Sequence, residues 1–95
     1  MKKIIIPIIE RKRSQVELFN KLPDAAKRLF VIIAKMHKDD NSVSLDDIRN
    51  LNMFGTTSDI EYLLYALESR GFGEIKVNRA ETYFFGNKIL MQSVL

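Results

Sequence analysis

Cysteine and tryptophan are missing from this chain of 95 residues, and histidine occurs once. Without cysteine the chain forms neither disulfides nor thiolate metal sites, a composition that fits an intracellular, cytoplasmic protein. A single histidine without cysteine gives no basis for a metal centre, so we expect neither a metal nor another cofactor. Every apolar run is much shorter than the roughly 20 residues of a membrane-spanning helix, so we expect no membrane association.

Patterns of catalytic residues are absent as well. The histidine, His37, lies on the apolar face of a predicted helix near its end, which favours a packed or helix-terminating side chain over a metal ligand. Asp46 and Asp47 are neighbours on a predicted helix and therefore point to different faces. No glycine-rich phosphate loop occurs. With no nucleophile, base and orienting group to combine, the sequence predicts a protein that is not an enzyme.

The net charge of +3 hides an uneven distribution along the chain. Residues 1–38 carry ten Lys and Arg against three acids, a balance of +7. Residues 39–74 carry two against eight, a balance of −6, and residues 75–95 carry three against one, a balance of +2. Blocks of opposite sign indicate an interaction surface.

Three helices are predicted from apolar residues that recur at helical spacing. Pro23 opens the first helix, over 23–38, and a shorter helix is expected before it. The second helix, over 45–51, has Ser44 as its N-cap. A capping box of Ser58 and Glu61 starts the third helix, over 58–70. The apolar stripe that this third helix turns toward a core consists of Ile60, Leu63, Leu64 and Leu67.

The hydrophobic period changes from 3.6 to 2 after Gly71, which stands at the C′ position of the third helix. Ile75 and Val77 alternate with a polar residue, and a second alternating run follows a short polar connection at 78–81. This pattern predicts a β-hairpin over 74–85.

The order of helix, tight turn, longer helix, glycine and hairpin resembles that of winged helix-turn-helix DNA-binding proteins. The run 65–72 (Tyr-Ala-Leu-Glu-Ser-Arg-Gly-Phe), followed by a strand, is similar to the end of the second helix of that motif and the start of the wing. The resemblance covers residues 23–86. It implies a mainly α fold, a three-helix core with a small β wing, in which residues 42–44 form a first strand that pairs with the wing. The single domain 1–95 then has an N-terminal arm and short helix, 1–22, and a C-terminal tail, 87–95.

Both ends of the chain carry apolar residues beyond this core. The segment Ile4–Ile9 is β-branched, and Pro7 restricts it to an edge strand or to a segment that needs a partner. It either packs on its own domain or forms a dimer contact. The tail 87–95 fits a final helical turn, a third wing strand or a dimer arm. Helix-turn-helix proteins commonly read two half-sites as symmetric dimers, so we expect a homodimer that uses one or both ends.

The third helix is expected to present an uncharged polar face. At about 100° per residue, the residues opposite its apolar stripe are Ser58, Tyr62, Tyr65 and Ser69. Three acids border this face and oppose its entry into a DNA groove, namely Asp59, Glu61 and Glu68. Whether they exclude such entry is a question that the sequence leaves open.

Two functions remain. The first is a small DNA-binding protein that contacts double-stranded DNA and serves in transcription regulation or in organising the DNA of a replicon, plasmid or virus. Hydroxyls and helix N-termini bind phosphates, and basic residues neutralise them. The candidate DNA-binding residues are Lys27, Arg28, Arg49, Thr56, Thr57, Ser58, Tyr62, Tyr65, Lys76 and Arg79. The alternative is a protein–protein interaction module whose contact patch is the Tyr62/Tyr65 face, because tyrosine is enriched at interface hot spots.

Overall fold

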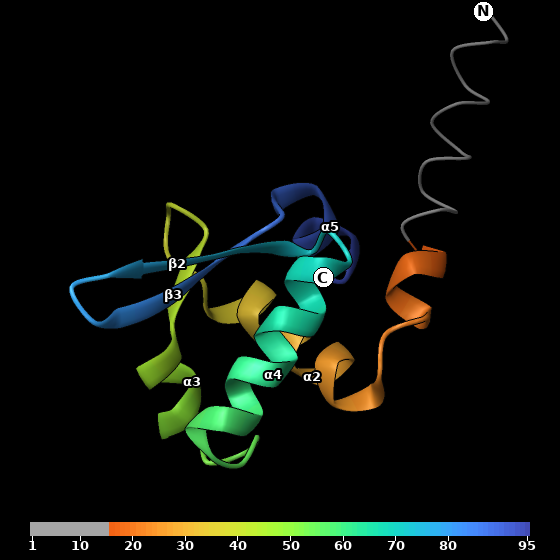
Figure 1. Cartoon of the computed structure of the whole chain (residues 1–95). Helices are drawn as coiled ribbons and strands as arrows, with labels where there is room; N and C mark the ends of the chain where they lie inside the picture. Colours follow the sequence, from red (N-terminus) through yellow and green to blue (C-terminus); the bar gives the residue numbers. More distant parts are fainter. Residues whose placement is uncertain (1–15) are drawn as a thin grey trace, which may run out of the picture.

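The computed structural model describes residues 16–95, which form a small α/β structure of helices packed on a three-stranded sheet (Figure 1). Residues 16–20 are helical. The elements that follow are α2 (Asp24–Met36), β1 (Ser42–Ser44), α3 (Leu45–Asn50), α4 (Thr57–Ser69), β2 (Gly73–Asn78), β3 (Glu81–Gly86) and α5 (Lys88–Ser93). The three predicted helices, the strand at 42–44 and the hairpin are confirmed, with ends within two residues of those expected. The predicted arm at Ile4–Ile9 lies outside the described residues.

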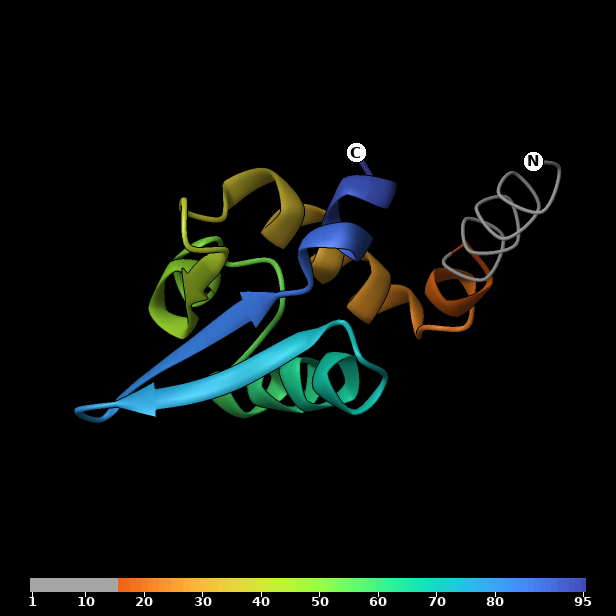
Figure 2. The same ribbon diagram turned by 90° about the horizontal axis from the view of Figure 1, so that it is seen from above.

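The sheet is antiparallel and has the order β1-β3-β2. Its register pairs Val43 with Phe84 and Ile75 with Phe84, so these three side chains share the face that meets the core. The hairpin β2–β3 lies above α3 and α4 in Figure 1, and Figure 2 shows its tip projecting beyond the helices. Each helix within residues 16–95 is too short or too polar to cross a lipid bilayer.

The core forms where α2, α4 and the sheet meet. Leu64 and Leu67 are fully buried, as predicted from the helical period of α4. The Phe30 ring of α2 packs edge-on against the Phe72 ring, with ring centroids 4.9 Å apart. Both rings are fully buried. Aromatic pairs in this geometry add to the stabilisation that burial alone provides.

The C-terminal tail becomes the helix α5 and packs on its own domain. Asn87 caps it, because its side-chain oxygen accepts hydrogen bonds from the N–H groups of Ile89 (3.1 Å) and Leu90 (3.2 Å). Leu90 and Met91 are buried in the core. The structure therefore selects the helical interpretation of the tail over a third wing strand, and these two side chains are not available to a dimer arm.

Local chemistry sets the ends of α3 and α4. Ser44 caps α3 as predicted, since its hydroxyl accepts a hydrogen bond from the Asp47 N–H at 3.0 Å. At the end of α4, Gly71 has a φ of 82°, and the Phe72 N–H donates to the Leu67 carbonyl at 2.9 Å. This is the Schellman arrangement that a C′ glycine makes possible.

The capping box predicted from Ser58 and Glu61 is wrong. Thr56 is the N-cap of α4: its hydroxyl accepts from the Asp59 N–H (3.2 Å), and the Asp59 carboxylate accepts from the Thr56 N–H (2.9 Å). The same spacing occurs two residues earlier than expected, and the helix starts there because Gly55, with a φ of 91°, makes the preceding turn.

We expect Thr56→Ala to lower the free energy of unfolding by about 1 kcal/mol, because the change removes the hydroxyl that satisfies the first turn of α4. Urea denaturation followed by circular dichroism measures this. The matched control is Ser58→Ala, an exposed position that caps nothing, which should stay within about 0.5 kcal/mol of the unsubstituted protein. A larger loss at Ser58 than at Thr56 would contradict the observed cap.

Candidate nucleic-acid interface

The exposed face of α4 carries the side chains that the helical period predicted. Tyr62 is 69% exposed and Tyr65 is 58% exposed, and Ser58 and Ser69 are exposed beside them. None of these four residues is charged, so the face offers hydroxyl groups and two aromatic rings. Such groups donate hydrogen bonds to phosphates or base edges, or pack against bases.

Two of the three acids that border this face are held by contacts within the chain. Asp59 forms half of the capping box, and the hydrogen bonds from Thr56 lower the pKa of its carboxyl group, which stays ionised at neutral pH. Glu68 is half-buried, and its carboxylate accepts a hydrogen bond from the Ile75 N–H of β2 at 2.7 Å. These contacts explain the presence of two acids on α4, and they join the helix to its cap and to the hairpin.

Arg79 lies at the tip of the hairpin in an unusual backbone conformation. The connection between β2 and β3 consists of Arg79 and Ala80 alone, with φ values of 52° and 67°. Two-residue hairpin turns with both residues in this region favour Asn-Gly, because most side chains are strained there. The turn therefore presents an exposed cationic side chain at the most distant point of the wing, at some cost in backbone strain.

The two faces of the hairpin differ, and the structure separates Lys76 from the tyrosines. Val77 and Ile75 line a small hollow with Tyr65 of α4. Lys76 alternates with them, and its Nζ lies 4.8 Å from the centroid of the Phe85 ring and 3.9 Å from a Glu74 oxygen. Lys76 is thus on the face of the sheet that turns away from α4.

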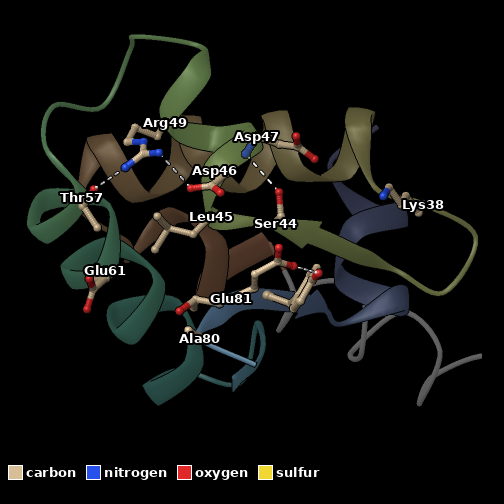
Figure 3. Close-up of a pocket in the computed structure, with 12 residues that line it drawn as sticks. Lys38, Ser44, Leu45, Asp46, Asp47, Arg49, Thr57, Glu61, Ala80 and Glu81 are labelled. Carbon is tan, nitrogen blue, oxygen red and sulfur yellow. Dashed lines mark hydrogen bonds and ion pairs between the residues drawn. The ribbon is translucent and has the colours of Figure 1, made fainter. Parts of the chain in front are cut away.

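Thr57 and Arg49 are brought together at one side of α4. Figure 3 shows Arg49 between Asp46, 3.0 Å away, and the Thr57 hydroxyl, 3.4 Å away. They line a cleft of about 510 Å³ between α3, α4 and the hairpin. Four carboxylates also line it, those of Asp46, Asp47, Glu61 and Glu81. Local spacing gives a signal for the ion pair between Arg49 and Asp46, since these residues are three apart on one helix.

This acidic cleft has few features of a catalytic or metal site. The Tyr83 hydroxyl donates to the Glu81 carboxylate, and this hydrogen bond raises the pKa of Tyr83. Within residues 16–95, no group of His, Asp and Glu side chains is arranged to hold a metal ion. His37 is the C-cap residue of α2 and is half-buried, and its ring Nδ1 lies 2.9 Å from the Lys38 carbonyl. A nucleic acid that approaches α4 must avoid the cleft, because phosphates and carboxylates repel.

Lys27 and Arg28 lie apart from the α4 face. Both line a shallow hollow on the outer side of α2, together with Phe19 and Met53. That hollow shares no lining residue with the one between α4 and the hairpin. These two cations could not be separated from the others by sequence, because local spacing does not show that Met53 lies beside α2.

Comparison of the chain with protein-family models, with curated proteins and with solved structures finds no match.

Proposed function

We propose that this protein is a winged helix-turn-helix protein that binds double-stranded DNA. The chain order supports this: α2 precedes the short strand β1, the helix pair α3 and α4 follows, and the hairpin comes last. The pairing of β1 with β3 also fits the first strand and wing of that fold. The fold alone does not determine function, so the proposal depends on the exposed face of α4.

The observation that carries the proposal is the uncharged face of α4 between two phosphate-binding features. Thr56 is the N-cap of the helix, and its hydroxyl, which accepts from the Asp59 N–H, still has its own hydrogen to donate to a phosphate. Arg79 stands at the tip of the wing. Two of the bordering acids are held by the chain itself, so they are explained without reference to a ligand.

The candidate residues then divide by role. Thr56 and Arg79 contact phosphates, which fix the position of the protein on the duplex. Thr57 lines the acidic cleft, where its hydroxyl accepts a hydrogen bond from Arg49, and it does not contact phosphate directly. Ser58, Tyr62 and Tyr65 supply contacts to bases or sugars. Arg49, Lys76, Lys27 and Arg28 lie outside this contact surface and add long-range attraction rather than direct reading. In this role the protein serves transcription regulation or the organisation of a small replicon.

Selection from a pool of random duplexes, followed by fluorescence anisotropy, tests the proposal. Arg79→Ala should weaken binding to all duplexes alike, because it removes a phosphate contact. Tyr62→Ala should reduce the preference among sequences and leave the affinity for the random pool nearly unchanged. The control is Lys88→Ala, which removes an exposed cation on α5 that plays no part in the proposed surface. Equal effects of Arg79→Ala and Lys88→Ala would argue against a wing contact.

A second candidate function is a protein-interaction module, favoured by the exposure of apolar surface next to the acidic cleft. Val77 is 69% exposed and lines a hollow with Tyr65, and Glu61 lines both this hollow and the cleft. A partner with an apolar segment flanked by basic residues would match this surface. Failure to bind any duplex at low salt, together with loss of a protein partner in Tyr62→Ala, would establish this function instead.

A further inference from the structure

The outer side of α2 carries an apolar surface that the proposed DNA contact does not use. It is a shallow hollow of about 290 Å³, here called the α2 groove, lined by Phe19, Lys27, Arg28, Val31, Ile32 and Met53. A second hollow continues it, because Phe19 and Val31 also line that one together with Val16 and Val94. Together the two hollows form a continuous, largely apolar surface along α2.

We propose that the α2 groove is the contact between two copies of this chain in a symmetric dimer. In such a dimer the same patch of both copies is buried, so the patch must be complementary to itself. The α2 groove has both parts that this requires. Met53 protrudes with 60% of its surface exposed, whereas Phe19, Val31 and Ile32 are half-buried and form the floor.

Charged side chains of both signs lie at the rim of the α2 groove, so the rim of one copy can complement the rim of another. Lys27 and Arg28 line the groove, and Asp24 lies 4.0 Å from the Lys27 Nζ with a side chain that is 95% exposed. In a symmetric dimer each copy offers its partner both an exposed carboxylate and two cations. A partner with charge of one sign would leave part of this rim unmatched, and complementary charge fixes register and partner choice.

A dimer formed through the α2 groove is compatible with binding to two DNA half-sites. None of the residues of the exposed α4 face, Ser58, Tyr62, Tyr65 and Ser69, lines the α2 groove, so a dimer through the groove does not require these side chains. It also replaces the tail as the expected dimer contact, because Leu90 and Met91 pack in their own core. Association of two copies through the α2 groove does not depend on DNA binding.

Sedimentation equilibrium of the full chain from low to high micromolar concentration tests it. The unsubstituted protein should dimerise, and Met53→Asp should weaken association about tenfold or more, since two carboxylates would be buried against apolar side chains. The matched control is Ile89→Asp, which places the same charge at a residue of α5 that is 58% exposed and outside the groove. It should dimerise like the unsubstituted protein.

A fluorescent reporter tests the same contact without disrupting it. The chain has no tryptophan, so Met53→Trp introduces the only one. Its emission should shift to shorter wavelength as protein concentration rises, and that of Ile89→Trp should not. A monomer at high micromolar concentration, or unchanged dimerisation in Met53→Asp, would overturn the proposal. A monomer that loses thermal stability when residues 1–9 are deleted would overturn it too, and would assign the groove to the N-terminal segment of the same chain.

Discussion

Replacement of Leu67 by alanine is expected to lower the free energy of unfolding by about 2–5 kcal/mol, the largest loss predicted for this protein. Leu67 is fully buried on the inner face of α4, and its carbonyl also accepts the hydrogen bond from Phe72 that ends the helix. Truncation to alanine leaves a cavity that the surrounding side chains fill only in part. Small domains have thin margins of stability, so a loss of this size brings the chain close to unfolding.

Urea denaturation followed by circular dichroism measures the loss, with Tyr62→Ala as the matched control on the same helix. Tyr62 is 69% exposed, so its truncation should change the free energy of unfolding by no more than about 0.5 kcal/mol. Similar losses for the two variants would mean that the buried and exposed faces of α4 have been assigned incorrectly.

The second large effect is expected at Gly73, where any side chain meets crowded surroundings. A Cβ at this position would overlap the buried Phe84 ring and would lie 2.5 Å from the Phe85 carbonyl oxygen. The carbonyl belongs to the paired strand β3 and cannot move without breaking the register of the hairpin. Gly73→Ala should therefore cost about 1–3 kcal/mol, as overpacking in a core does.

Gly86→Ala provides the comparison for this second prediction. Its Cβ would contact the side chain of Met91, chiefly the sulfur, rather than the backbone. Methionine is flexible and adapts to irregular space, so the cost should be smaller than at Gly73. Thermal unfolding of the two variants gives the order directly, and a higher melting temperature for Gly73→Ala than for Gly86→Ala would contradict the packing described at β2.

The elements of the fold were predictable because local patterns and tertiary packing agree. The 3.6-residue spacing of Ile60, Leu64 and Leu67 identifies both the length of α4 and its buried face. The N-cap of α4 was placed two residues late because Thr56 with Asp59 and Ser58 with Glu61 have the same spacing. Gly55 was the signal that distinguishes them, since a turn glycine directly precedes the true cap. Asn87 was likewise a local signal, since an Asn at this position is a good N-cap for α5. The packing of α5 on α2 could not be predicted from local sequence.

The candidate site was predictable where it depends on a single element. The exposed tyrosines follow from the period of α4, and alternation in β2 already put Lys76 on the opposite face from Val77. Contacts between elements were not predictable from local spacing. The carboxylate of Glu68 binds the N–H of Ile75, and Lys27 lies beside Met53, only because the chain folds back on itself.

The salt dependence of duplex binding tests the central proposal most directly. Phosphate contacts release counterions, so the affinity of the protein for a random duplex should fall with salt by a log–log slope of about −0.9 per cationic contact. Arg79→Ala should reduce the magnitude of that slope by about one unit, because one such contact is lost. Tyr62→Ala should leave it nearly unchanged. Absence of duplex binding at low salt, or a slope that Arg79→Ala does not change, would contradict the proposal that the wing and α4 hold DNA.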